Sequence, residues 1–414
     1  MPTLHAPRFL FLFTVLFIFA CTGSAVGQHE GGVTGGGMIG GSTTRSSSKP
    51  ASTTKPPRKR PTTTKPSATT TTPVVKPTTG TKPSTSTVPP VRAGSASMAD
   101  HSYQQGEALY NQKKYREALE HYKLAAQFNP SMASAHYRMG WIYNDLEDYE
   151  SALEPLQRAV ALSPNYAAAH FEIGYAYKKL ERYNEARAAF QQTVRAKPDY
   201  ASAHYEIGWI ENDLKNYDDA IKSLKLAMQY RANYAEAHNE MGYALRHLGR
   251  YSEAIEEYNA AIRLKPDYSL AHLGLGDVYF YNTKQYAEAA KSYKEGLRLR
   301  PDNVTALYNL AWCYNDLERY PEAIEELRKA INLRPSYAEA YNEMGYAYHQ
   351  LNRYPEAIQS YQSAIKHKSD YSSAHYHLGL SYIAMKNKNA ALEQYRILQR
   401  IDATRATKLF NQIK

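Results

Sequence analysis

The chain has 414 residues, of which 43% are hydrophobic and 22% are charged, and its formal net charge is +10. Residues 1–100 contain 11 of the 50 lysines and arginines but only two of the 40 acidic residues. The rest of the chain is therefore nearly neutral, which argues against a folded nucleic-acid-binding domain. The only cysteines are Cys21 and Cys313, so no framework of intramolecular disulfides supports the fold.

Residues 1–27 have the layout of a secretory signal sequence. Arg8 precedes a nearly continuous apolar run over residues 9–21, which is too short for a comfortable membrane span of about 20 residues. The residues that end at Gly27 are small and predict cleavage after it. Two alternatives remain: Cys21 becomes the lipidated first residue of a bacterial lipoprotein, or the segment stays as an uncleaved anchor. We expect an exported protein that is periplasmic, envelope-associated or secreted.

Residues 28–98 form a linker of biased composition. The segment is rich in glycine over residues 31–41 and then in serine, threonine, proline and lysine, with almost no large apolar residues. It cannot offset the entropic cost of ordering, so we expect a disordered tether that is stiffened by its Lys-Pro pairs. Its positive charge favours contact with an anionic wall polymer or membrane surface. The alternative is that lysine only keeps the tether solvated.

From residue 99 onwards the sequence repeats with a period of 34 residues. The nine units are 99–132, 133–166, 167–200, 201–234, 235–268, 269–303, 304–337, 338–371 and 372–405. Position 8 of each unit is glycine or alanine and position 20 is alanine, which predicts two closely packed helices per unit. Tyrosine recurs at position 17, near the turn, and proline at position 32 should end the second helix.

These residues resemble the tetratricopeptide repeat family, in which small residues occupy positions 8 and 20 and proline occupies position 32. The resemblance implies an all-α, right-handed superhelical solenoid. The first helix of each unit would line a concave groove, and the second would lie outside. One extra residue within 279–285 marks a place where the array should deviate. Residues 406–414 have helically spaced apolar side chains and should form a capping helix, because terminal units must cover an open face.

Histidine recurs at position 4, in His136, His170, His204, His238, His272 and His375. Adjacent helix axes lie roughly 8–10 Å apart, whereas zinc needs its nitrogen ligands within about 2.1 Å. We therefore expect these histidines to pack between units, without a metal or a cofactor. The sequence contains no Gly-x-Ser-x-Gly, Walker or His-Glu-x-x-His motif and leaves no room for a catalytic domain, so it predicts a non-enzymatic protein.

The family geometry implies that positions 2, 5, 9, 12 and 13 line the groove. All three tryptophans occupy position 9, and an Asn-Asp pair follows each of them one helical turn later. The candidate ligand-binding residues are Tyr137, Trp141, Asn144, Phe171, Tyr175, Tyr205, Trp209, Asn212, Asn239, Tyr243, Tyr308, Trp312, Asn315, Asn342 and Tyr346. Two interpretations stay open: these side chains stabilise the array, or they form a ladder of platforms for an extended ligand.

Position 6 is glutamate at Glu172, Glu206, Glu240 and Glu343. Such a groove should not hold an acidic C-terminus, as the chaperone-binding members of the family do. We therefore expect a protein–protein interaction scaffold of the cell envelope or extracellular space that binds an extended peptide or a partner helix. The alternative is a glycan or wall polymer, held by the aromatic groove and the basic tether. We expect no nucleic-acid partner, and a lipid anchor would depend on Cys21.

Overall fold

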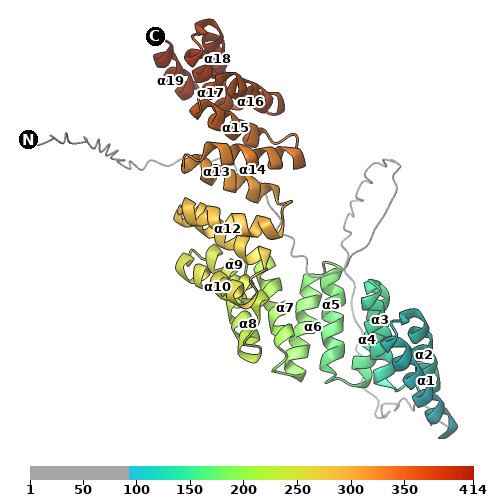
Figure 1. Ribbon diagram of the computed structural model, residues 1–414. Coiled ribbons are helices and arrows are strands. Elements are labelled where there is room, and N and C mark those ends of the chain that lie inside the picture. The colour runs from blue at the N-terminus through green and yellow to red at the C-terminus, as the bar shows by residue number, and fades with distance from the viewer. Residues whose placement is uncertain (1–92) are drawn as a thin grey trace, which may run out of the picture. The chain divides into compact units, whose positions relative to one another are not determined.

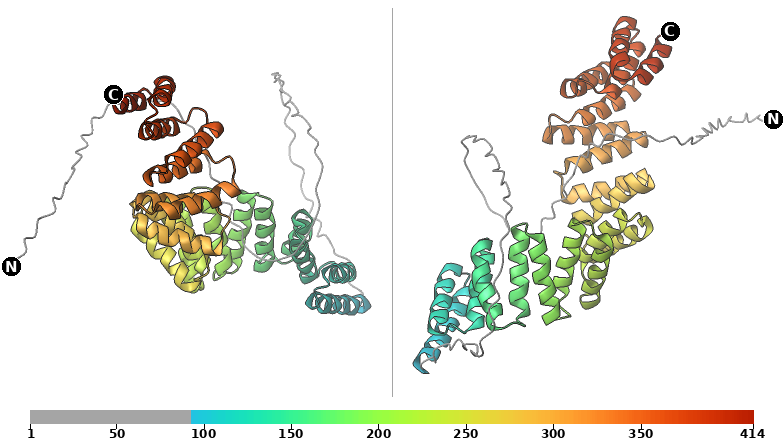
Figure 2. Two further views of the ribbon diagram at one scale, coloured as in Figure 1. Left: turned by 45° about the horizontal axis from the view of Figure 1, so that its top comes forward. Right: turned by 180° about the vertical axis from the view of Figure 1, so that it is seen from behind.

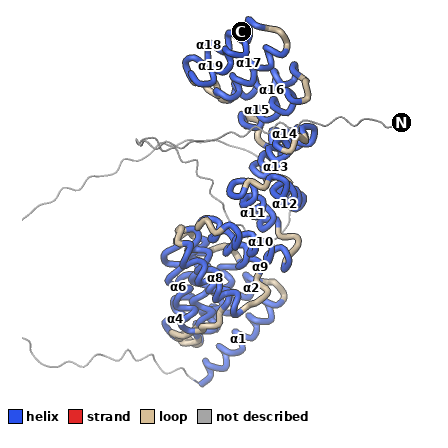
Figure 3. Tube along the Cα trace, turned by 90° about the vertical axis from the view of Figure 1, so that its left-hand side faces the viewer, coloured by secondary structure: helices blue, strands red, loops and turns tan. Residues whose placement is uncertain are grey.

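The computed structural model describes residues 93–414 (Figure 1). The predicted signal sequence and residues 28–92 of the predicted linker lie outside the described residues. Between residues 93 and 414 all regular structure is helical, and short loops join the helices (Figure 3). In this part of the chain, no helix combines the length and the apolar character that a membrane crossing requires.

Eighteen of the described helices form nine antiparallel pairs. The first helices are α1 (Ala93–Asn111), α3 (Ala133–Asp145), α5 (Ala167–Lys179), α7 (Ala201–Asp213), α9 (Ala235–His247), α11 (Ser269–Asp277), α13 (Val304–Asp316), α15 (Ala338–Gln350) and α17 (Ser372–Ala384). The second helices are α2 (Tyr115–Phe128), α4 (Tyr149–Leu162), α6 (Tyr183–Ala196), α8 (Tyr217–Tyr230), α10 (Tyr251–Leu264), α12 (Tyr286–Leu299), α14 (Tyr320–Leu333), α16 (Tyr354–His367) and α18 (Lys388–Ile401). The pairs stack in chain order (Figure 2), which confirms the predicted all-α solenoid.

The small residue at position 8 lets the two helices of a unit approach closely. A Cβ atom added to Gly140 would lie 2.3 Å from Cγ of Leu156, and one added to Gly345 would lie 2.7 Å from the ring of Tyr361. Both Leu156 and Tyr361 are fully buried in the second helix of their unit. The spacing of small residues in the sequence therefore reports a real steric constraint.

The turn between the two helices holds one residue in the left-handed region. These residues, all at position 15 or its equivalent, are Lys113, Glu147, Glu181, Lys215, Gly249, Lys284, Glu318, Asn352 and Lys386, with φ between 55° and 75°. A left-handed residue after a helix lets its last carbonyls accept hydrogen bonds from the turn. The second helix then starts two residues later.

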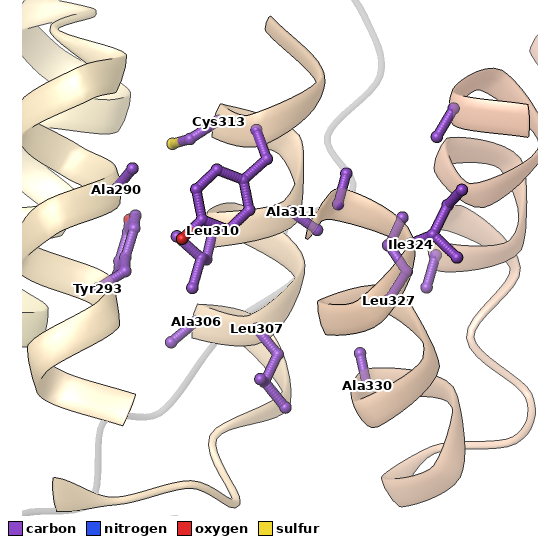
Figure 4. Packing of buried hydrophobic residues seen from close by; sticks show 14 of the residues in the cluster. Ala290, Tyr293, Ala306, Leu307, Leu310, Ala311, Cys313, Ile324, Leu327 and Ala330 are labelled. Atoms are coloured by element: carbon purple, nitrogen blue, oxygen red, sulfur yellow. The ribbon is translucent and has the colours of Figure 1, made fainter. Parts of the chain in front are cut away.

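The core is a row of clusters, most of which are shared between consecutive pairs, whereas the last joins α18 to α19. Figure 4 shows one of them, in which Tyr293 of α12, Leu310 of α13 and Leu327 of α14 are almost completely buried. Cys313 belongs to the same cluster, and its burial raises the pKa of the thiol to about 12. Cys313 is therefore a protonated packing residue.

The extra residue of the sixth unit is accommodated by a π-helix, η1 (Val278–Thr283), which directly continues α11. A π-turn inserts one residue into a helix without ending it. The wider turn carries Phe280 to the ring of Trp312, with ring centroids 5.2 Å apart. The deviation that the sequence predicts is thus a local widening of the first helix.

Both ends of the described array differ from an average unit. Helix α1 begins at Ala93, so residues 93–98, which the sequence assigned to the disordered linker, are helical instead; they contain no proline that would interrupt the helix. Ala99 is the first fully buried residue, so packing begins where the repeat begins. At the other end, α19 (Ala403–Ile413) buries Ala406, Leu409 and Ile413 against the last unit.

Candidate functional site

Successive first helices are joined by a ladder of contacts between position 12 of one unit and position 6 of the next. Nδ2 of Asn144 donates to the main-chain oxygen and the carboxylate of Glu172, at 3.1 and 2.9 Å. Asn212 contacts Glu240 in the same way, at 3.0 and 3.1 Å. Asn315 repeats the contact with Glu343, at 3.3 Å for both bonds. Lys178 replaces asparagine in one step and pairs with Glu206 at 2.6 Å.

This ladder changes the role of several predicted site residues. Asn144, Asn212 and Asn315 are only 3–4% exposed, and they position the next helix. Three further candidates are also buried, namely Tyr205, Asn239 and Asn342. Most of the surface of these side chains is covered by neighbouring helices, so little of it is open to a ligand. Tyr205 packs against Tyr234 of the same unit, and Asn239 and Asn342 each donate to the carboxylate of the glutamate that follows them.

The aromatic residues at position 5 also pack within the array. The ring centroids of Tyr137 and Tyr166 are 4.9 Å apart, and those of Phe171 and Tyr200 are 5.0 Å apart. Tyr308 packs against Tyr337 with a centroid distance of 5.2 Å. Each pair joins position 5 to position 34 of the same unit. At this position the stabilising interpretation accounts for the side chains.

The rings at position 9 are half-buried and keep one part open. Each packs edge-on against the position-17 tyrosine of the preceding unit. The pairs are Tyr149–Tyr175, Tyr183–Trp209, Tyr217–Tyr243, Tyr286–Trp312 and Tyr320–Tyr346, with centroid distances of 4.8–6.3 Å. These contacts hold the rings in place. Trp141, in unit 2, instead packs 5.1 Å from Tyr110.

Most of the position-4 histidines form a hydrogen bond with the loop that precedes their helix. Nε2–H donates to the carbonyl of the residue six positions earlier in His136, His170, His204, His272 and His375, at 2.8–3.2 Å. His238 follows Ala232, which replaces the usual proline, and it contacts Glu257 instead, at 2.6 Å. These are the packing contacts that the sequence predicted. Between residues 93 and 414, no cluster of three or more His, Cys, Asp and Glu side chains could hold a metal ion.

A pocket of about 220 Å³ opens on the first helices of units 7, 8 and 9. It is lined by Trp312, Asn315 and Asp316 of α13, Asn342, Glu343 and Tyr346 of α15, and Ser373 and His377 of α17. Trp312, Asn315, Asn342 and Tyr346 were predicted as ligand-binding residues. The structure thus brings four of the candidates from two units together at one place.

Four lining residues were not among the candidates. Asp316 belongs to an Asn-Asp pair that the sequence marked, and Glu343 belongs to the position-6 glutamates. Ser373 and His377 lie in the last unit, whose position 9 is Leu380 rather than an aromatic residue. The sequence could have indicated His377, because it occupies the same repeat position as Glu343. Only stacking shows that α17 completes the pocket.

The pocket offers hydrogen-bond acceptors and no positive charge from its lining. Burial raises the pKa of Glu343, although the amides of Asn315 and Asn342 partly offset this effect. Burial, with smaller contributions from His349 and Arg405, lowers the pKa of His377 to about 4, so its imidazole is neutral at pH 7. Oδ1 of Asn315 and of Asn342 is buried and has no hydrogen-bond partner among residues 93–414.

Family models match the described array almost throughout. A TPR repeat model matches residues 106–143, 140–181, 242–282, 280–312, 313–352 and 345–386. Two further tetratricopeptide repeat models match residues 171–235 and 373–403. The chain belongs to the tetratricopeptide repeat family. Proteins of this family stack their repeats into extended binding surfaces, so this tetratricopeptide array is a scaffold for protein interactions.

Several solved structures are similar to parts of this tetratricopeptide chain. The C-terminal part of a TPR repeat-containing protein from Cytophaga hutchinsonii is 15% identical, with a TM-score of 0.49, covering 58% of this chain and 99% of that one. Pseudomonas aeruginosa pilF is 19% identical, with a TM-score of 0.46 and coverages of 50% and 94%. YrrB, a TPR protein with an unusual peptide-binding site, is 24% identical, with a TM-score of 0.41 and coverages of 45% and 95%. No curated protein matches the sequence.

Proposed function

We propose that this protein is an exported scaffold that holds an extended peptide segment of a partner protein on its first helices, with the Trp312 pocket as the principal contact. The observation that carries the proposal is the pocket itself. Two aromatic rings, Trp312 and Tyr346, line it together with the hydroxyl of Ser373 and the exposed carboxylate of Asp316. An extended peptide supplies both apolar side chains and main-chain N–H donors.

The rest of the first-helix surface supports a long ligand rather than a compact one. Position-9 rings recur along the array at Trp141, Tyr175, Trp209 and Tyr243, and all four are half-buried rather than fully covered. Aromatic residues are enriched at binding hot spots because they bury a large area with few rotatable bonds. The export part of the proposal rests on the sequence of residues 1–27 alone.

A glycan or wall polymer is the competing occupant, because aromatic faces with neighbouring amides also suit a sugar. Site-specific crosslinking in the native host separates the two. We would place p-benzoylphenylalanine at Ser373, which lines the pocket, and as a matched control at Gln359, which is exposed on the second helix α16.

The expected result is a crosslink from position 373 to an extended peptide segment of another protein, mapped by mass spectrometry. Position 359 should give no such product, and Trp312→Ala should abolish the crosslink at position 373 while helicity is unchanged. Equal crosslinking from both positions, or a product that contains only polysaccharide, would contradict the proposal.

A further inference from the structure

In units 2 to 5, each position-9 ring carries a cationic side chain that the array itself supplies. The distances to the ring centroid are 4.5 Å for Cζ of Arg138 over Trp141, 5.3 Å for Nζ of Lys179 over Tyr175, 3.9 Å for Nζ of Lys178 over Trp209 and 5.8 Å for Cζ of Arg246 over Tyr243. A cation within about 6 Å of a ring centroid is attracted to the face of the ring.

Three of these cations also pair with a carboxylate on a first helix. The pairs are Arg138–Glu107, Lys178–Glu206 and Arg246–Asp277, at 2.6–2.8 Å. In each case the cation lies between an aromatic ring and an acid. This combination recurs along the N-terminal half of the array.

Units 7 and 8 lack the residues that supply these cations. Gln350 in unit 8 takes the position of Lys179, and His349 takes that of Arg246. Burial lowers the pKa of His349, which leaves it neutral at pH 7. Among the described residues, no lysine or arginine lies over the ring of Trp312 or Tyr346.

The contact between the first helices of units 6 and 7 also contains no cation. Tyr281 of the π-helix contacts Asn309, 28 residues later, which is the separation that joins Lys178 to Glu206. Both ionic groups of that pair are therefore replaced by neutral ones. Trp312 and Tyr346, the two rings without a cation, are the two rings that line the pocket.

The acids of the pocket are unpaired too. Within residues 93–414, neither Asp316 nor Glu343 forms an ion pair, and the carboxylate of Glu343 accepts hydrogen bonds only from the amides of Asn315 and Asn342. Asp316 is exposed at the rim, whereas Glu343 lies deeper. Two rings, two acids and the side chains of Asn315 and Asn342 thus line the same space.

We infer that the Trp312 pocket receives a lysine or arginine side chain of the bound peptide, an inference that rests on the proposed function. The incoming cation takes the place that Lys178 and Arg246 take in the N-terminal units, over a ring and beside a carboxylate. In units 2 to 5 a lysine or arginine of the array lies over each position-9 ring. In the pocket of units 7 to 9 the cation comes from the bound peptide.

The test uses the full-length protein labelled with 5-fluorotryptophan, whose three ¹⁹F signals report on the three tryptophans separately. The probes are the peptide acetyl-Ser-Thr-Arg-Thr-Ser-amide, its lysine analogue, and its citrulline analogue, which keeps the shape of arginine but is uncharged. The ionic strength is about 0.1 M, where charges are screened beyond about 10 Å. The arginine and lysine peptides should shift the Trp312 signal, and the citrulline peptide should bind roughly three- to tenfold more weakly.

Two variants localise the effect. Asp316→Asn should weaken the arginine peptide about threefold or more, whereas Asp213→Asn, at the same repeat position beside Trp209, should not change its binding. Gln350→Lys restores the residue type of unit 3 and should place a cation of the array itself at the pocket, so it should also weaken the peptide. Circular dichroism checks that each variant keeps its helicity.

Equal binding of the arginine and citrulline peptides would overturn the inference, as would equal shifts of all three tryptophan signals or no shift at about 10 mM peptide, the weak end of the millimolar range. A shift of Trp312 by a trisaccharide of N-acetylglucosamine, with none by the peptides, would assign the pocket to a glycan. If crosslinking at position 373 captures a peptide while the charge tests fail, the proposed function stands and only the cation is wrong.

Discussion

Single residues in the turns between helices carry a cost that the fold imposes. Lys215 sits in the left-handed region with φ of 63°, and Gly249 occupies the equivalent turn of the next unit with φ of 75°. Glycine adopts this conformation readily, whereas a side chain adds about 1 kcal/mol of strain. Seven of the nine turns use neither glycine nor asparagine. The packing of the helices, rather than the turn residue, therefore determines the turn.

We expect Lys215→Gly to stabilise the array by up to about 1 kcal/mol, because the substitution removes the left-handed strain. The reciprocal change, Gly249→Lys, should destabilise it by a similar amount. Urea unfolding of both variants beside the wild type measures the two effects. The explanation fails if the two substitutions change the stability in the same direction.

Buried carboxyl groups make the stability of the array depend on pH. Burial raises the pKa of Glu172 to about 7, although the Asn144 amide partly offsets the effect. In an unfolded chain the pKa of glutamate is about 4.3. A raised carboxyl pKa favours the folded state below the unfolded value, and this contribution is lost as the pH rises through about 7.

We expect Glu172→Gln to raise the thermal midpoint at pH 8 and to leave it almost unchanged at pH 5. Glutamine stays neutral, still accepts from Asn144, and adds a donor for Oδ1 of Asn144, which is buried without a partner among residues 93–414. Calorimetry at the two pH values measures the effect. The exposed Glu256→Gln provides the control, and a stabilisation at pH 5 as large as that at pH 8 would contradict the ionisation argument.

At the scale of elements, the closest helix pairs depend on the absence of a side chain. Gly140 faces Leu156 so closely that an added Cβ would meet both the side chain and, at 3.0 Å, the main-chain oxygen of Ala152. Main-chain atoms of a packed helix cannot move aside independently. The two helices must separate if the position is filled.

We expect Gly140→Ala to destabilise the array by about 1–3 kcal/mol, since overpacking outweighs the gain in helix propensity. Gly94→Ala is the matched control, because it lies in α1 and an added Cβ would meet nothing within 4 Å. That variant should be neutral or stabilised by up to about 1 kcal/mol. Denaturant unfolding measures the stability of both variants. Equal effects would show that the steric conflict at Gly140 does not determine the stability.

At the scale of the whole molecule, the charge distribution separates two regions. The excess of basic over acidic residues lies before residue 93, while the described array pairs many of its charges along and between helices. The array can therefore present neutral aromatic surface and local acid without a strong overall field. The attraction to an anionic surface that the sequence predicts would therefore come from the N-terminal region.

The export proposal makes a direct prediction about the mature N-terminus. Mass spectrometry of the protein from its native host should find Gln28 as the first residue if the signal is cleaved after Gly27. A diacylated or triacylated Cys21 would instead indicate a lipid-anchored protein. A mature chain that still begins at Met1 would leave only the uncleaved anchor and would remove the case for a released scaffold.

Local periodicity was sufficient to predict the helix pairs and their close contacts. Gly140, Ala152 and Leu156 constrain one another within a single unit, so a 34-residue pattern carries all the information about that contact. The sequence also placed Trp312 and Asn315 correctly on one face of a helix, one turn apart. Nothing within unit 7 shows what covers that face.

The residues that lie over this face of α13 belong to other units, so only the stacked structure shows them. Asn315 lies against Glu343, 28 residues later, and so serves as an inter-unit contact as well as a pocket wall. The pocket needs α13, α15 and α17 together, and it differs from the other aromatic sites because no cation of the array covers Trp312 or Tyr346. The sequence by itself determined how each unit folds, because those contacts are local. The tertiary structure decided that α13, α15 and α17 together line one pocket, because that depends on packing between units.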